Sequence, residues 1–421
     1  MKLSGLRVIR LYSELPREIH VLFFARLVNS MGAFVFPFLT LYLTQKMGLS
    51  TATAGLYMLL VAAAHVPGAI LGGKLTDRIG RKKVLVFGQA MAGAFLLPGA
   101  VLGTSILVPW SIFAAQFFAA LAQPSNQAMA TDLTNRSNRQ AAFSLLYLGY
   151  NLGFAVGPLL AGFLFTNLTW LLFLGDAFTT FVSVGMVALL VPDSTPSADD
   201  VSRVDRMPAM ERPEKGHTLV ALRARPVLLI FALLVSVLTF VYSQYGFALP
   251  LRLKELFLER GPVFYGTLMT MNAIVVIVLT APVVLVTRRF SPARNLSHAA
   301  LCYVVGFGMI YFLRTFPVFF VSTAIWTLGE ILVSTNSNVY IANHTPVSHR
   351  GRFNALFPLI TGGGRALSPP VIGRFILWFG LSAVWPVLAA LAALAGIGLL
   401  VLARRDPPGS DAPSGNDRPV S

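Results

Sequence analysis

The stretch that decides the fold reads Gly73-Lys-Leu-Thr-Asp77-Arg78-Ile-Gly80-Arg81-Lys82-Lys83-Val-Leu85. It is short and strongly charged, and it lies between two long apolar runs, 52–75 and 84–107. Each run is as long as the ~20 apolar residues that cross the hydrocarbon layer of a membrane. We therefore expect a tight turn between two antiparallel spanning helices, with Gly73 and Gly80 where backbones pack closely or adopt positive φ. Its cations should stay on the cytoplasmic surface, and Asp77 can cap or face a helix N-terminus.

The composition of the whole chain indicates an integral membrane protein. Of its 421 residues, 55% are hydrophobic and only 12% are charged, and the mean hydropathy is +0.70. Ordinary soluble domains are less apolar than this. The net charge of +16 is dispersed over short loops, so it indicates membrane orientation rather than nucleic-acid binding. The single cysteine, Cys302, excludes an intramolecular disulfide and a cysteine-based zinc site.

The apolar runs divide the chain into two halves of six predicted spans. The first six spans are expected at 19–44, 52–75, 84–105, 108–133, 141–165 and 170–191, and the second six at 225–250, 263–287, 295–314, 317–341, 352–378 and 381–403. The segment between the halves is rich in Pro, Ser, Asp, Glu and Arg, as a flexible linker is. We therefore expect an N-terminal segment (1–18), a six-helix bundle (19–191), a linker (192–224), a second bundle (225–403) and a tail (404–421).

The distribution of Lys and Arg predicts the orientation. The N-terminal segment, the 76–83 turn, the linker and the tail carry most of these cations, and all four fall on one side of a twelve-span topology. Because cytoplasmic loops are enriched in cations, both termini and the linker should be cytoplasmic in a plasma (inner) membrane protein.

A weak internal repeat relates the two halves. An offset of 210 positions superposes Asn126 on Asn336, Phe143 on Phe353, Leu146 on Leu356 and Gly153 on Gly363. The counterpart of the opening turn, 287–294, keeps cations but lacks the acid and the glycines. The two halves therefore differ at this turn.

The spacing of the opening stretch, G-x-L-x-D-R-x-G-R-K-x-x-L, resembles the loop 2-3 signature of the major facilitator superfamily at every specified position. The resemblance implies an all-α membrane protein with twelve transmembrane helices in two pseudo-symmetric six-helix bundles. It also implies a conformational latch at the cytoplasmic face, formed by Gly73, Asp77, Arg78, Gly80, Arg81, Lys82 and Asp132. An ordinary cluster of caps and surface charges is the alternative.

A second motif lies in span five, from Gly149 to Gly162. Glycines four residues apart share a helix face, and Pro158 can kink the helix, so Gly153, Gly157 and Pro158 are a candidate hinge. Generic packing by small residues is the alternative. The pattern G-x-x-x-G-P-x-x-A-G resembles the antiporter motif of drug/proton exporters of this superfamily, with Ala161 in place of a glycine. Span four has Gln116 in the region where many such exporters have an arginine, so that arginine cannot serve proton coupling here.

Glu330 is the acidic residue near the middle of span ten. Thr323, Trp326, Ser334 and Ser337 recur with it at helical spacing, which predicts a polar stripe along a wet cavity. The L-G-E segment resembles a group of multidrug/proton antiporters, which implies a proton-coupling role for Glu330. A structural pair with Arg365, or simple helix contact, is the alternative. We expect the other intramembrane acid, Asp176, to be structural, capping span six or pairing locally.

The expected function is secondary active transport by alternating access, with proton-coupled export of hydrophobic or amphipathic small molecules. A proton-coupled importer of a nutrient or small metabolite, or a non-transporting membrane receptor on the same fold, is the alternative. We expect a monomer in the lipid bilayer that handles a small-molecule substrate and protons, with no cofactor, metal, nucleic acid or enzyme activity. Packing between helices is the alternative role for the residues of the candidate substrate cavity, which are Arg26, Asn29, Tyr242, Gln244, Trp326 and Arg365.

Overall fold

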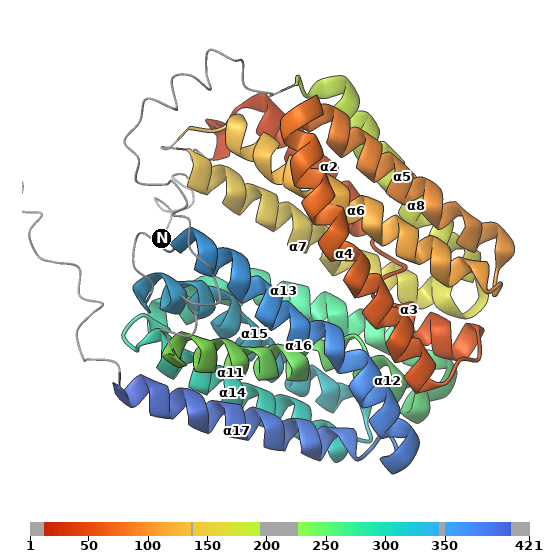
Figure 1. Cartoon of the computed structure of the whole chain (residues 1–421). Coiled ribbons are helices and arrows are strands. Elements are labelled where there is room, and N and C mark those ends of the chain that lie inside the picture. The colour runs from red at the N-terminus through yellow and green to blue at the C-terminus, as the bar shows by residue number, and fades with distance from the viewer. Residues whose placement is uncertain (1–11, 136–137, 194–225, 345–349, 406–421) are drawn as a thin grey trace, which may run out of the picture. The chain divides into compact units, whose positions relative to one another are not determined.

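A computed structural model describes residues 12–135, 138–193, 226–344 and 350–405, and the regular elements among them are all helical (Figure 1). The first half contains α2 (Arg17–Met31), α3 (Leu39–Leu41), the π-helix η1 (Tyr42–Lys46), α4 (Thr51–Ile79), α5 (Arg81–Leu102), α6 (Leu107–Asp132), α7 (Arg139–Asn167) and α8 (Thr169–Leu190). The second half contains α11 (Pro226–Tyr242), η2 (Ser243–Tyr245), α12 (Ala248–Phe257), η3 (Leu258–Arg260), α13 (Gly261–Thr287), α14 (Pro292–Gly308), η4 (Met309–Tyr311), α15 (Phe316–His344), α16 (Arg350–Phe379) and α17 (Val384–Arg405).

These helices account for the twelve predicted spans of an all-α membrane protein. Helices α4 to α8 are spans two to six, and α13 to α17 are spans eight to twelve. Nearly all of the predicted linker, residues 1–11 of the N-terminal segment and residues 406–421 of the tail lie outside the described residues.

Span one is broken, although the sequence predicts one continuous run over 19–44. Helix α2 ends at Met31, and residues 32–38 form turns before α3 and η1. Pro37 lies in this break, where it has no backbone N–H to donate. Span seven also breaks, after Tyr242, where η2 precedes α12. Under the offset of 210 positions, Met31 corresponds to Val241, one residue before the end of α11, so the two breaks occupy equivalent places in the repeat.

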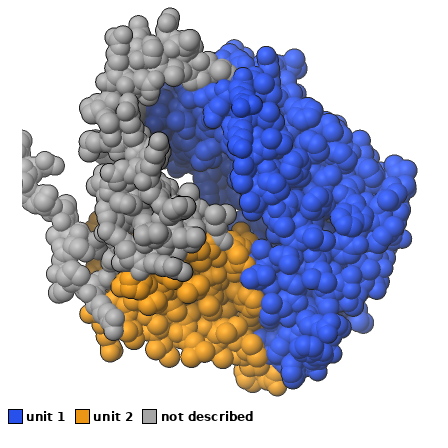
Figure 2. Space-filling model, viewed as in Figure 1, with its two compact units in different colours: residues 1–208, 243–277, 366–384 blue, residues 209–242, 278–365, 385–421 orange. Residues whose placement is uncertain are grey.

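The chain forms two compact units, coloured separately in Figure 2. Unit 1 comprises 1–208, 243–277 and 366–384, and unit 2 comprises 209–242, 278–365 and 385–421. In unit 1, α4 and α5 both pack on α6, α5 also packs on α8, and α2 packs on α7 and α8. In unit 2, α14 packs on α15. The bundle boundaries expected from the sequence stay a prediction, because unit 1 includes segments of the second half.

Glycines allow the helices of unit 1 to approach at backbone distance. In lipid, burial of apolar side chains does not drive helix association, so close packing of small residues matters more. A Cβ atom at Gly88 would lie 2.9 Å from the carbonyl oxygen of Phe118, and one at Gly72 would overlap the carbonyl of Leu121. Large apolar side chains face outward instead; Val101 and Leu189 are each 84% exposed, as lipid-facing residues are.

Candidate functional site

The charged stretch 76–83 forms the end of α4 and the start of α5, and Gly80 is the single residue between the two helices. Its φ is 102°, in the region that L side chains rarely adopt, so a glycine is required there. Gly73 differs from the expectation, because it lies inside α4 and a Cβ atom there would meet nothing within 4 Å. The neighbouring Gly72 makes the close backbone contact instead.

One ion pair connects this turn to α6. Arg81, the first residue of α5, donates from Nε to Oδ2 of Asp132, the last residue of α6, over 3.0 Å. The carboxylate therefore lies at the N-terminus of α5, where the helix dipole favours negative charge. Asp77 and Arg78 are exposed and form no ion pair with any described residue. Of the acids and arginines in the predicted latch, the structure thus joins Arg81 and Asp132.

The glycines of span five contact two different helices. On one face of α7, a Cβ atom at Gly153 would lie 2.5 Å from the carbonyl oxygen of Leu27 in α2, and one at Gly157 would lie 2.9 Å from that of Met31. Beyond Pro158, a Cβ atom at Gly162 would lie 2.7 Å from the carbonyl oxygen of Pro262 in α13, and the carbonyl of Pro158 itself lies against Gly266 of α13. The span therefore packs at backbone distance on both sides of its proline.

The helix α7 continues through Pro158, which cannot donate to the carbonyl of Phe154. The hydroxyl of Thr270 in α13 donates to the carbonyl of the next residue, Ala155, over 2.6 Å. A neighbouring helix thus covers a backbone carbonyl one residue away from the one that the proline leaves free.

Glu330 lies half-buried in α15 beside a cluster of aromatic rings within unit 2. Trp326 is fully buried, with Tyr242 edge-on to it at 5.9 Å between ring centroids, and Tyr242 stacks on Tyr303 at 6.0 Å. Tyr303 is close enough to Glu330 and to Arg365 for both charges to act on its hydroxyl. Two of the residues singled out from the sequence, Tyr242 and Trp326, therefore belong to this cluster, and two others, Glu330 and Arg365, lie within electrostatic range of it.

Gln244, which the sequence analysis includes in the same candidate substrate cavity, is not part of this cluster. It is fully buried in unit 1 and donates from Nε2 to the hydroxyl of Ser368 in α16. Its position indicates a packing contact between the bend of span seven and span eleven.

Arg26 and Asn29 line a cavity of about 220 Å³ inside unit 1. Its wall combines the guanidinium of Arg26 with polar side chains from four other helices, namely Gln89, Asn126, Tyr150 and Ser183. Arg26 forms no ion pair with a described residue. The cavity therefore holds a positive charge and neutral hydrogen-bonding groups, an arrangement able to receive an anionic or polar group.

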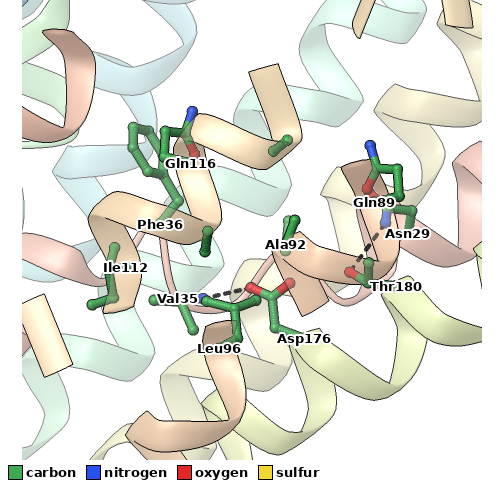
Figure 3. A pocket seen from close by; sticks show the side chains of 13 residues that line it. Asn29, Val35, Phe36, Gln89, Ala92, Leu96, Ile112, Gln116, Asp176 and Thr180 are labelled. Carbon is green, nitrogen blue, oxygen red and sulfur yellow. Dashed lines mark hydrogen bonds between the residues drawn. The ribbon is translucent and has the colours of Figure 1, made fainter. Parts of the chain in front are cut away.

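A second cavity of about 180 Å³ shares Asn29, Ala33 and Gln89 with the first. Figure 3 shows Asp176 in its wall, with the hydrogen bond from Val35. The carboxylate Oδ2 accepts from the backbone N–H groups of both Phe34 and Val35, each over 3.2 Å. The expectation that Asp176 caps span six is wrong, because α8 begins seven residues earlier, at Thr169. The residue instead holds the break in span one.

The sequence singles out Asp176, but no sequence pattern predicts this cavity or the presence of Gln89 in its wall. The available signal was an acid within the otherwise apolar run 170–191. No group of three or more His, Cys, Asp or Glu side chains suited to a metal ion occurs in the part of the chain that the structure describes.

Comparison with known proteins relates the chain to membrane transporters. A family model described as Major Facilitator Superfamily matches residues 22–369 and, in a second match, 253–420. The chain is 26% identical over 393 residues to a Na(+), Li(+), K(+)/H(+) antiporter of Planococcus maritimus, covering 88% of this chain and 91% of the relative. It is 25% identical over 418 residues to the enterobactin exporter EntS of Salmonella choleraesuis, covering 87% and 89%.

A crystal structure of a POT family transporter in complex with a thioalcohol-conjugated peptide has a similar fold. The TM-score is 0.76 at 15% identity, over 93% of this chain and 96% of the other. The fold, the twelve spans and the extent of the family match agree. The chain belongs to the major facilitator superfamily, whose members are membrane transporters and not enzymes.

Proposed function

We propose that this protein exports hydrophobic or amphipathic small molecules in exchange for protons, by alternating access. The observation that carries the proposal is Glu330, a carboxylate within a spanning helix, next to the aromatic cluster of Tyr242, Tyr303 and Trp326. An intramembrane acid is suited to take up and release a proton. Aromatic faces are suited to apolar and cationic substrates.

The two relatives support different parts of this proposal. The antiporter of Planococcus maritimus supports exchange against protons, and the enterobactin exporter supports outward transport of a small molecule. Neither relative specifies the substrate of this chain. The proposed substrate class therefore rests on the aromatic cluster.

The proposal assigns conformational roles to two further groups. The residues Gly73, Asp77, Arg78, Gly80, Arg81, Lys82 and Asp132 act as a latch at the cytoplasmic face, and Gly153, Gly157 and Pro158 act as a hinge. The Arg81–Asp132 ion pair and the backbone contacts of α7 support these roles. The proposed location is the plasma membrane, with both termini cytoplasmic.

A second candidate function is proton-coupled import of a nutrient or small metabolite bearing a carboxylate. The observation that favours it is Arg26, which forms no ion pair among the described residues and lines a cavity with Tyr150. A guanidinium within the membrane is expected to face an anionic group or water.

Transport by the reconstituted protein tests these candidates. Vesicles with an imposed pH gradient are loaded with lipophilic cations or aromatic carboxylates, and substrate movement and internal pH are followed together. We expect the wild type to exchange lipophilic cations for protons and Glu330→Gln to lose the coupling. The matched control is Glu259→Gln, because Glu259 is an exposed carboxylate outside the spans, paired with Lys254 at 2.7 Å.

The outcomes separate the candidates. Coupling that survives in Glu330→Gln would mean that Glu330 is structural. Movement of carboxylates in place of lipophilic cations would favour the importer. A wild type that moves no compound and no protons would favour a receptor.

A further inference from the structure

The two carboxylate oxygens of Asp176 differ in their hydrogen bonds. Oδ2 accepts from the N–H groups of Phe34 and Val35, which lie in the break of span one, outside any helix. Oδ1 accepts no hydrogen bond from a described residue, and Asp176 forms no ion pair within the described ranges. Two backbone donors favour the ionised form of the carboxylate and its burial disfavours it, so a bound cation would compensate a charge that no described residue neutralises.

The cavity beside Asp176 contains neutral polar groups as well. Figure 3 shows Gln116 from α6, Gln89 from α5 and Thr180 from α8 around it. Asn29 donates from Nδ2 to the hydroxyl of Thr180 over 3.2 Å, and the side-chain amides of Gln89 and Gln116 make no hydrogen bond with any described residue. Polar groups left unsatisfied in a membrane protein cost free energy, so the cavity suits a polar occupant. About 180 Å³ is ample for a small ion with some of its water.

The charges on the elements around Asp176 leave its carboxylate uncompensated. Within the spans, α2 contributes Arg26, η1 contributes Tyr42 and Lys46, and α7 contributes Tyr147 and Tyr150. Lys46 donates from Nζ to the carbonyl of Thr166 over 2.8 Å and does not line this cavity. Arg26 lines the neighbouring cavity rather than this one. The remaining titratable groups of α2, α5, α6 and α7 are at their predicted cytoplasmic ends: Arg17, Glu18, His20, Arg81, Lys82, Lys83, Asp132 and Arg139.

We propose that the Asp176 cavity binds a monovalent cation, either a proton or an alkali metal ion, as a second ionic site separate from Glu330. One carboxylate in a cavity whose wall also presents amide and hydroxyl groups suits a single positive charge. A divalent ion is usually held by more carboxylates or carbonyls than this cavity offers. The inference rests on the proposed transport function and names an ion that takes part in it.

Occupancy of the site would act on the break in span one. The segment that donates to Asp176 continues to Phe38, whose ring lies 5.2 Å from that of Tyr265 in α13, and to Thr40, which donates to the carbonyl of Gly246 over 2.8 Å. All these residues belong to unit 1. A cation on Asp176 competes with the backbone donors for the carboxylate charge, so binding changes how firmly this segment is held.

Thermal unfolding of the purified full-length protein tests the proposal. Na⁺, Li⁺ and K⁺ chlorides are compared with choline chloride at constant ionic strength, over a range of pH. We expect small cations to raise the Tm of the wild type in a saturable manner. In Asp176→Asn the concentration for half-maximal effect should rise at least tenfold, whereas Asp193→Asn, just beyond the end of α8, should behave as the wild type.

The arms of the experiment identify the ion. A Tm that responds to alkali cations through Asp176 indicates an alkali site, and a Tm that responds only to pH, again through Asp176, indicates a proton site. Identical responses of the wild type and Asp176→Asn to every cation and pH would overturn the proposal. If Asp176→Asn does not fold, Gln116→Leu keeps the carboxylate and is expected to weaken the alkali response; an unchanged response there would also count against the site.

Glu330→Gln separates this inference from the proposed export function. The variant should keep the cation response of the wild type, because Glu330 lies in unit 2 and lines neither cavity of unit 1. A protein that exports none of the tested compounds yet shows the Asp176-dependent response would retain the cation site without the export function.

Discussion

Arg81 Nε lies 3.0 Å from Asp132 Oδ2, and the pair joins the first residue of α5 to the last residue of α6. The two side chains are 15% and 23% exposed, so solvent screens them less than it screens an open surface pair. The turn at Gly80 places Arg81 in this position.

A double-mutant cycle on this pair should show measurable coupling. We expect Arg81→Gln and Asp132→Asn to be non-additive by about 0.5–1 kcal/mol in the free energy of unfolding, the upper part of the range for partly exposed pairs. Unfolding in mixed micelles provides the measurement. The control cycle combines Arg78→Gln with Asp132→Asn, and because Arg78 is exposed and pairs with no described residue, these two changes should be additive. Additivity in both cycles would remove the ion pair as a stabilising contact.

The two glycines of the opening stretch should respond oppositely to alanine. Gly80→Ala places a side chain at φ 102° and should lower the free energy of unfolding by about 1–3 kcal/mol. Gly73→Ala lies within α4 with open space around the new Cβ, so the better helix propensity of alanine should raise it by up to about 1 kcal/mol. The same unfolding assay compares the two variants. A stable Gly73→Ala variant with reduced transport would point to a role of Gly73 in the latch, whereas equal destabilisation of both variants would contradict the structure.

The sequence predicts the positions of the spans well and the interior of span one poorly. Runs of about 20 apolar residues are local signals, and α6, expected at 108–133, occupies Leu107–Asp132. The break at 32–38 is itself mostly apolar, so hydropathy continues across it, and Pro37 is a weak local signal. The break depends on Asp176, about 140 residues away in the chain, whose hydrogen bonds to Phe34 and Val35 no local pattern reveals.

The candidate site likewise combines residues of one helix, which the sequence can relate, with residues of several helices, which it cannot. Helical spacing places Glu330 and Trp326 on one stripe of span ten, and the structure has both residues in one helix, α15; their role in transport stays a prediction. The cavity around Asp176 was not predicted, because Gln89, Gln116 and Asp176 come from three helices whose packing the sequence does not specify.

The contact between α7 and α13 should be sensitive to one methyl group. Gly266→Ala would direct a Cβ atom into the carbonyl of Pro158, and both backbones must move to relieve the overlap. We expect a loss of about 1–3 kcal/mol in the free energy of unfolding, as for other overpacked sites. Gly185→Ala is the matched control, since a Cβ atom there meets nothing within 4 Å and the residue is also inside a helix. A Gly266→Ala variant as stable as the control would show that these helices separate easily.

The hydroxyl of Thr40 connects the two broken spans, because it donates to the carbonyl of Gly246 over 2.8 Å while Thr40 itself is fully buried. Thr40→Val keeps the shape of the side chain and leaves that carbonyl without its donor, which should cost about 1–3 kcal/mol. Thr44→Val is the control, because the hydroxyl of Thr44 donates within its own segment, to the carbonyl of Thr40 over 2.7 Å, and such local bonds contribute little to stability.

Hydrogen exchange of the backbone amides at 32–38 and 243–247 provides a second measurement of this contact. Faster exchange in both segments of Thr40→Val, with neither changed in Thr44→Val, is the expected result; faster exchange in only one segment would mean that the two breaks open independently.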